Sequence, residues 1–160
     1  MNWQAICDNP QFRDLPFQFE TNRWGHIVMS PATNRHGFFQ AKLARLLDEL
    51  GKQGISITEC SIQTTEGVKV ADVAWASKNF LKRHHFANPY LEAPEIVVEI
   101  LSPSNSQAEM DENKELYFSH GAHEFWLCDE EGAIRFFNNH TELTRSTLAP
   151  SFPVRVSLPF

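Results

Sequence analysis

The stretch Pro94-Glu-Ile-Val-Val-Glu-Ile-Leu-Ser-Pro-Ser104 decides how this chain folds. Its apolar, β-branched run from Ile96 to Leu101 predicts a buried strand, which Ser102-Pro103 ends. Glu99 interrupts that run, and a carboxylate rarely lies in such a strand unless it is paired or binds a metal. The stretch therefore predicts a central strand whose carboxylate has a structural or chemical task.

A second acid lies in a similar setting upstream, in Val68-Lys-Val-Ala-Asp-Val-Ala-Trp75. Side chains alternate along a strand, so Glu99 shares a face with Val97 and Leu101. If the two strands are neighbours in a suitable register, the carboxylates of Asp72 and Glu99 lie close together. Two such groups repel each other unless a cation or a shared proton neutralises them, and oxygen ligands of this kind suit Mg²⁺ or Mn²⁺.

The remaining pattern predicts helices and strands in mixed order, without repeats or linkers. We expect a short helix and a loop in residues 1–16, a helix from Thr33 or Asn34 to Leu50, a basic helix in 78–86, a helix in 106–119, hairpins formed by 17–22 with 24–29 and by 124–128 with 133–137, and strands at 55–62, 68–75, 96–101 and 152–158. This order predicts a single α/β or α+β domain spanning residues 1–160.

Composition narrows the functional classes. The chain has 160 residues and a net charge of −6, so no overall basic field attracts nucleic acid, although a local basic groove is compatible with that charge. The three cysteines lie far apart, which predicts neither a disulfide framework nor a zinc ribbon. The N-terminus lacks a signal-peptide pattern, and no apolar run approaches the ~20 residues of a membrane helix, so we expect a cytoplasmic protein without membrane association.

Several short motifs, taken together in their order, resemble a known family. The chain resembles the PD-(D/E)xK nuclease superfamily and, more narrowly, the Uma-two-like putative restriction endonuclease family of unknown function, from about residue 20 to the C-terminus. The motifs are Met29-Ser-Pro31, His36, Val70-Ala-Asp-Val73, Pro94 to Pro103, Lys114, Tyr117, Gly121 and Glu124-Phe-Trp-Leu-Cys-Asp129. The resemblance implies a restriction-endonuclease-like α/β fold, in which helices flank a mixed central sheet, and a Mg²⁺-dependent DNA endonuclease. A homodimer with two such sites facing one groove would favour cleavage of both strands, and the sequence leaves the oligomeric state open.

The resemblance also implies roles for individual residues. Asp72 and Glu99 would be the ligands of Mg²⁺ or Mn²⁺, and Lys114 would orient the attacking water or stabilise charge at phosphorus. Glu20 and His36 fall where the family often shows a Glu and a His near the site. The chain departs from the superfamily pattern at Leu101, where a lysine is usual, and the family resembled here places its lysine on the following helix, at Lys114.

Structural explanations stand beside these functional ones. Asp72 could be a hydrogen-bonded acid at a strand end, Glu99 could form a buried ion pair with Lys114, and His36 could be a packing residue. The basic cluster of residues 78–85 could contact phosphates or simply form an exposed helix face. Two other functions therefore remain: a non-catalytic interaction or regulatory module, and a metal-dependent hydrolase of a small phosphoester.

Overall fold

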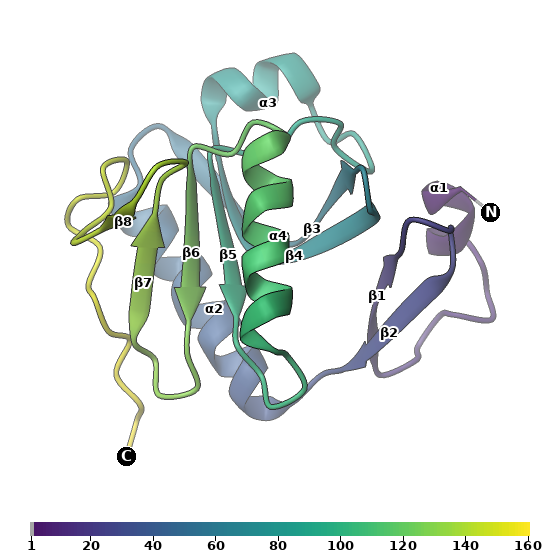
Figure 1. Cartoon of the computed structure of the whole chain (residues 1–160), viewed down its shortest axis with the longest axis horizontal. Helices are drawn as coiled ribbons and strands as arrows, with labels where there is room; N and C mark the ends of the chain where they lie inside the picture. Colours follow the sequence, from purple (N-terminus) through teal and green to yellow (C-terminus); the bar gives the residue numbers. More distant parts are fainter. Residues whose placement is uncertain (1) are drawn as a thin grey trace.

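The computed structural model, which describes residues 2–160, contains a six-stranded sheet and a separate two-stranded hairpin (Figure 1). Helix α2 covers one face of the large sheet and α4 covers the other, whereas α1 lies beside the hairpin. The elements are α1 (Trp3–Cys7), β1 (Phe17–Thr21), β2 (Ile27–Pro31), α2 (Asn34–Leu50), β3 (Gly54–Thr64), β4 (Gly67–Ser77), α3 (Lys78–His84), β5 (Ile96–Ile100), α4 (Gln107–Ser119), β6 (Glu124–Cys128), β7 (Ile134–Phe137) and β8 (Glu142–Leu143).

The large sheet runs in the order β3-β4-β5-β6-β7-β8 and is mixed. Its β5 and β6 are parallel because α4 connects them across one face, and every other neighbouring pair is antiparallel. This architecture confirms the predicted mixed α/β sheet flanked by helices.

The sheet ladder is interrupted at one place. The β3–β4 pairing joins Gly54–Thr58 to Val73–Ser77 and Cys60–Thr64 to Gly67–Ala71, and it skips Glu59 and Asp72. Glu59 has a φ of 53°, a left-handed conformation that is uncommon for a residue other than glycine. On the other side of β4, pairing with β5 stops at Val73 and Val98, so Asp72 is outside both ladders.

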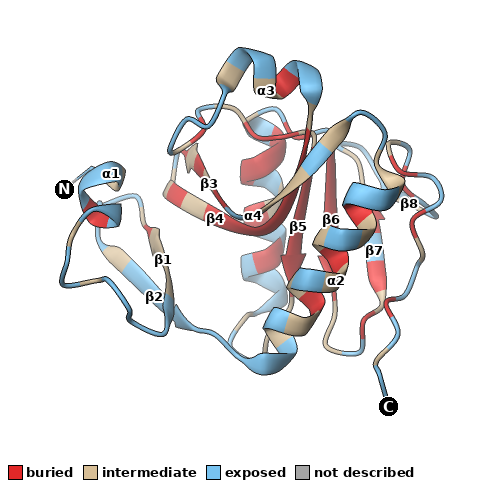
Figure 2. Ribbon diagram, turned by 180° about the vertical axis from the view of Figure 1, so that it is seen from behind, coloured by how far each residue is buried: buried red, intermediate tan, exposed pale blue. Residues whose placement is uncertain are grey.

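Two apolar clusters hold the helices against the sheet (Figure 2). On one side, the predicted stripe Phe39, Leu43 and Leu47 of α2 packs against Ile96 and Val98 and is fully buried. On the other side, the predicted packing residues Leu116 and Tyr117 of α4 are buried. The hydroxyl of Thr33 accepts the His36 N–H at 3.1 Å and begins α2 where the sequence predicts it.

Gly51 ends α2 as predicted, but it and Gly54 also make room for the Trp75 indole. A Cβ atom on Gly54 would lie 2.3 Å from Cζ2 of Trp75, and one on Gly51 would lie 2.4 Å from its Nε1. Because both distances are far inside van der Waals contact, side chains at either position would displace the indole from the α2 side of the sheet.

The predicted final strand in residues 152–158 is wrong. Phe152 and Val156 are buried, but Val154, which the alternation placed on the same face, is 60% exposed, so burial in this segment does not follow a period of two residues. The segment meets the sheet only through scattered hydrogen bonds, such as Val156 N to Gly132 O, and Pro153 lacks the N–H a ladder needs. The sheet ends instead at the two-residue β8.

The other expected elements are present with shifted ends. The first hairpin turns later than predicted, so that its second strand begins at Ile27 rather than Trp24. All three cysteines are free, and none of the helices within residues 2–160 is long and apolar enough to cross a membrane.

Candidate functional site

A cleft of about 350 Å³ opens where β1, the middle of β4, the end of β5 and the first turns of α2 and α4 meet. The residues that line it include five acids and one histidine and, among those the structure describes, no lysine or arginine. The ionisable residues of the lining are Glu20, His36, Glu59, Asp72, Glu99 and Glu109. Negative charge thus dominates a partly enclosed site, which favours a bound cation.

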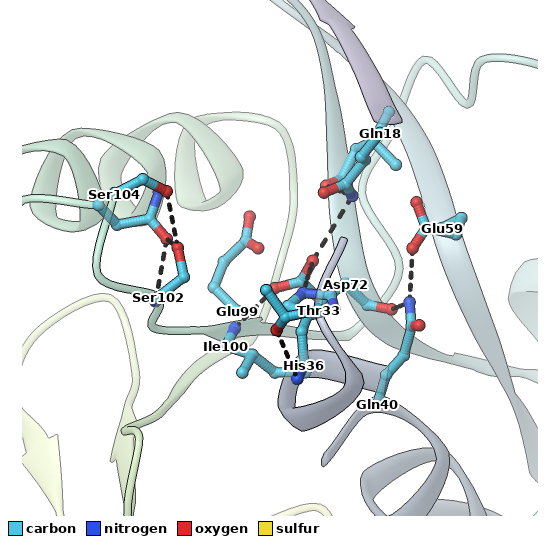
Figure 3. Close-up of polar contacts among 12 residues, drawn as sticks. Gln18, Thr33, His36, Gln40, Glu59, Asp72, Glu99, Ile100, Ser102 and Ser104 are labelled. Atoms are coloured by element: carbon cyan, nitrogen blue, oxygen red, sulfur yellow. Dashed lines mark hydrogen bonds and ion pairs between the residues drawn. The ribbon is translucent and has the colours of Figure 1, made fainter. Parts of the chain in front are cut away.

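Asp72 is buried, and its carboxylate replaces the missing ladder bonds (Figure 3). Its Oδ2 accepts the backbone N–H of Ile100 at 2.7 Å, which ties the end of β5 to β4. Extending the β4–β5 register by one residue places Asp72 directly opposite Glu99. The neighbouring strands and suitable register on which the sequence argument depended are therefore present.

Glu99 is 6% exposed and points from β5 toward α4. Burial raises its pKa well above the usual value, and the neighbouring charges of Asp72 and Glu20 raise it further. Only the hydrogen bond from the Tyr117 hydroxyl, at 2.7 Å, opposes that shift appreciably. A carboxylate in this situation gains strongly from a cation.

His36 extends from the first turn of α2 and contacts Asp72, with Nε2 2.9 Å from Oδ1. This contact confirms that the helix face of His36 is turned toward the sheet. The hydrogen bond to Asp72 raises the pKa of the imidazole, whereas partial burial opposes the rise. Among the described residues that line the cleft, this imidazole is the one group that can carry positive charge.

Glu20 reaches the cleft from β1. Its Oε1 accepts the Val70 N–H at 2.9 Å, and its Oε2 lies 3.7 Å from Nζ of Lys69. Burial raises the pKa of Glu20, and the charge of Lys69 opposes that shift. Glu20, His36, Asp72 and Glu99 are therefore brought together in one cleft.

Lys114, the fifth predicted site residue, does not line the cleft. Its ammonium lies 4.6 Å from the centre of the Phe137 ring, at the β7 side of α4, and it is outside the cleft lining. The helix instead turns Met110, Asn113 and Tyr117 inward, all of them buried and spaced by three and four residues. Lys114 follows Asn113 by about 100° around the helix, so it lies at the other edge of this inward face, where its ammonium reaches Phe137 and not the cleft.

Sequence reasoning missed several polar residues of the cleft, among them Glu59, Gln40 and Asn113. Glu59 lies opposite Asp72 in the gap of the ladder, and Gln40 Nε2 donates to Glu59 Oε1 at 2.6 Å and to the Asp72 carbonyl at 2.9 Å. Asn113 is 6% exposed, and its side chain forms no hydrogen bond with any residue the structure describes. Asn113 could have been found, because it precedes the predicted packing residue Tyr117 by four residues and so shares its helix face. Glu59 could not, because the polar residues around it give no pattern that singles it out.

The donors fit a hard divalent cation that keeps several waters. Within residues 2–160 no three His, Cys, Asp or Glu side chains are grouped closely enough to hold a metal by themselves. Mg²⁺ typically needs only one or two carboxylates, because it dehydrates reluctantly, whereas a structural zinc site needs four protein ligands. Asp72 and Glu99 would hold such an ion, whose charge would offset the burial and the acidic neighbours that raise the pKa of Glu99.

Comparisons with known proteins agree with this architecture. No curated protein matches the chain. The crystal structure of a putative nuclease belonging to DUF820 from Anabaena variabilis is similar, with a TM-score of 0.75 and 19% sequence identity, over 98% of this chain and 94% of that chain. At this identity the likeness shows a shared fold. The sequence itself matches the Uma2 family, described as putative restriction endonuclease, over residues 10–157, and because this match spans most of the chain, the protein belongs to that family, as its motifs indicated.

Proposed function

We propose that this protein is a Mg²⁺-dependent endonuclease that hydrolyses phosphodiester bonds of DNA in the acidic cleft. The observation that carries the proposal is the placement of Asp72 opposite Glu99 at the interruption of the sheet, in a cleft lined by five acids. A buried acidic pair of this kind is costly unless a cation binds there, and phosphodiester hydrolysis is a common use of such a cation. The family description supports the same reaction class.

The chain's own residues would divide the task as follows. Asp72 and Glu99 would hold the divalent cation, which lowers the pKa of bound water and neutralises charge at phosphorus. Tyr117 would fix the direction of the Glu99 carboxylate through its 2.7 Å hydrogen bond. Glu20, whose pKa is raised by burial, would accept the proton that the attacking water loses.

The cleft also offers neutral contacts for a phosphate. The first turns of α2 and α4 both contribute to its lining, through Thr33 and Gly37 and through Asn105 and Glu109. Unpaired N–H groups at helix N-termini favour anions there. The Asn113 amide, which is free of protein partners in the described chain, would supply a further donor.

A second reaction is favoured by one specific observation. The described lining of the cleft contains no lysine or arginine, and a polyanion is normally held by such residues. A small phosphoester carries less charge and needs fewer of them. Metal-dependent hydrolysis of a small phosphoester is therefore the alternative activity for the same residues.

The test measures metal binding before activity. Thermal unfolding is followed in EDTA and in millimolar Mg²⁺ or Mn²⁺ for wild type, Asp72→Asn and Glu99→Gln, with Glu115→Gln on the exposed side of α4 as the matched control. A ligand present at a hundredfold excess over its Kd stabilises the native state by about 2.7 kcal/mol. We expect a metal-dependent shift in wild type and in the control, and none in the other two variants.

The same four proteins are then given supercoiled plasmid, single-stranded DNA and a chromogenic phosphodiester. Cleavage of either DNA that is lost in Asp72→Asn and Glu99→Gln supports the proposal. Turnover of the small ester alone supports the alternative reaction. Neither a shift nor turnover in wild type would favour a non-catalytic module and would refute the proposal.

A further inference from the structure

The surface of α3 differs in charge from the rest of the molecule. The segment from Ser77 to Leu91 contains Lys78, Lys82 and Arg83 and no Asp or Glu, in a chain with 20 acidic and 14 basic residues. Helix α3 lies at the end of the sheet opposite the loop that joins β5 to α4, as Figures 1 and 2 show. This basic segment therefore belongs to a different part of the surface from the acidic cleft.

One face of α3 forms an open pocket of about 490 Å³. Lys78, Leu81 and Lys82 line it from one face of α3, and His85 and Phe86 line it from the residues that follow the helix. Leu81 forms an apolar floor and packs on the core, whereas the Phe86 ring projects into solvent and is 78% exposed. An aromatic ring this exposed, next to two lysines, is not explained by folding.

The charges of this pocket are available to a ligand. Lys78 and Lys82 form no ion pair with any residue the structure describes. Arg83 and His84 lie on the side of α3 that faces Glu92, at 3.9 Å and 2.9 Å from its carboxylate. Glu92 thus pairs with the cations on the side of α3 away from the pocket and leaves the charges of Lys78 and Lys82 on the pocket side unpaired.

We propose that this face of α3, which we call the α3 pocket (Lys78, Leu81, Lys82, His85 and Phe86), binds single-stranded nucleic acid. A flat apolar group fits against Leu81 and Phe86, and phosphate oxygens pair with Lys78 and Lys82. An unpaired base with its flanking phosphates combines these two features, and stacking on aromatic side chains is a general mode of single-strand binding. A base within a duplex is already stacked and leaves only the phosphate contacts.

The test uses binding alone, without metal. Anisotropy of a fluorescein-labelled oligothymidylate is measured in EDTA at several salt concentrations, for wild type, Lys78→Gln/Lys82→Gln and Phe86→Ala. The matched control is Arg145→Gln/Arg155→Gln, which removes two positive charges from the C-terminal segment. Circular dichroism shows that each variant is folded, and Glu99→Gln shows that binding is independent of the cleft and of the activity proposed there.

We expect both α3 variants to bind more weakly than the control. Phe86→Ala should lose about fivefold or more, the range of one stacked base, and the lysine variant should reduce the slope of log K against log salt by about 1.4. Equal binding by all the variants, or no binding by wild type at low salt, would overturn the proposal. The proposal would also be overturned if duplex DNA bound as tightly as the single strand and Phe86→Ala had no effect. Binding of phosphatidylserine vesicles but not of DNA would overturn it as well.

Discussion

The Tyr117 hydroxyl donates a 2.7 Å hydrogen bond to Oε1 of Glu99, and both side chains are buried between α4 and the sheet. The bond occupies one carboxylate oxygen from the α4 side, while Glu99 also lines the cleft. Tyr117 is held in turn by its ring, which stacks on Phe125 at 6.2 Å. The direction of the Glu99 carboxylate is therefore fixed by packing in the core of the protein.

Tyr117→Phe should weaken metal binding by removing that orientation. The hydrogen bond lowers the pKa of Glu99, so its loss raises that pKa further and makes the ionised form harder to reach. We expect a larger midpoint concentration of Mn²⁺ in thermal-shift titrations and a stability loss of about 1–3 kcal/mol. Tyr90→Phe, which removes the 2.8 Å bond to the His85 carbonyl, is the control and should keep the wild-type Mn²⁺ midpoint.

Metal-free stability should fall as pH rises, and Glu99 should be one cause. The folded-state pKa of Glu99 lies well above its usual value of 4.5, because the side chain is buried beside Asp72, so between these two values the folded protein binds the extra proton. For each extra proton that the folded state binds, the free energy of unfolding falls by about 1.4 kcal/mol for every unit that the pH rises. Glu20 and Glu59, whose pKa values burial also raises, act in the same direction.

Glu99→Gln removes this titration while leaving an oxygen to accept from Tyr117. In EDTA at pH 8, urea unfolding should show the variant to be more stable than wild type by about 1 kcal/mol or more, with a smaller difference at pH 5. Glu115→Gln should match wild type at both pH values. A variant less stable than wild type at pH 8 would contradict a raised pKa of Glu99 in the folded protein.

His36 should contribute stability only while it is protonated. Its pKa is raised above 6.5, chiefly by the hydrogen bond to Asp72, so its stabilisation is complete below that value and is lost as pH rises through the folded-state pKa. In EDTA, His36→Gln should be less stable than wild type at pH 6 by about 1.5–3 kcal/mol, and the deficit should shrink by pH 9. His140→Gln, in an exposed loop, is the control; a deficit independent of pH would contradict the charge-based explanation.

The sequence predicted those parts of the fold that depend on local periodicity. The apolar run of β5 and the helical spacing of Phe39, Leu43 and Leu47 each determine which side chains enter the core, and the structure has both. The proximity of Asp72 and Glu99 followed from the alternation of side chains along a strand, once the two strands were assumed to be neighbours. The contact of His36 with Asp72 followed from its place on the buried face of α2.

The parts that could not be predicted depend on how elements are placed in three dimensions. No local pattern shows that β3 and β4 skip the pair Glu59 and Asp72, because that gap is filled by Gln40 from a helix. The apolar residues Phe152, Val154 and Val156 alternate in the sequence, but Val154 is exposed, because this segment crosses the end of the sheet without pairing as a strand. The position of Lys114 depends on the rotation of α4 about its own axis, which Met110, Asn113 and Tyr117 determine together.

That rotation leads to a prediction that separates Asn113 from Lys114. Since the Lys114 ammonium lies over Phe137, we expect Lys114→Gln to keep hydrolysis within about threefold of wild type and to cost about 1 kcal/mol of stability, the value of a cation–π contact near the surface. Asn113→Leu keeps the size of the side chain but removes the free amide from the cleft. It should lower kcat/KM by more than tenfold, the loss expected for one hydrogen bond to a charged phosphate, while the Mn²⁺ thermal shift persists. The opposite result would be loss of turnover in Lys114→Gln and normal turnover in Asn113→Leu. It would mean that α4 rotates, or that Lys114 moves toward the acids, when substrate binds. Lys114 would then have the role that the family resemblance implies.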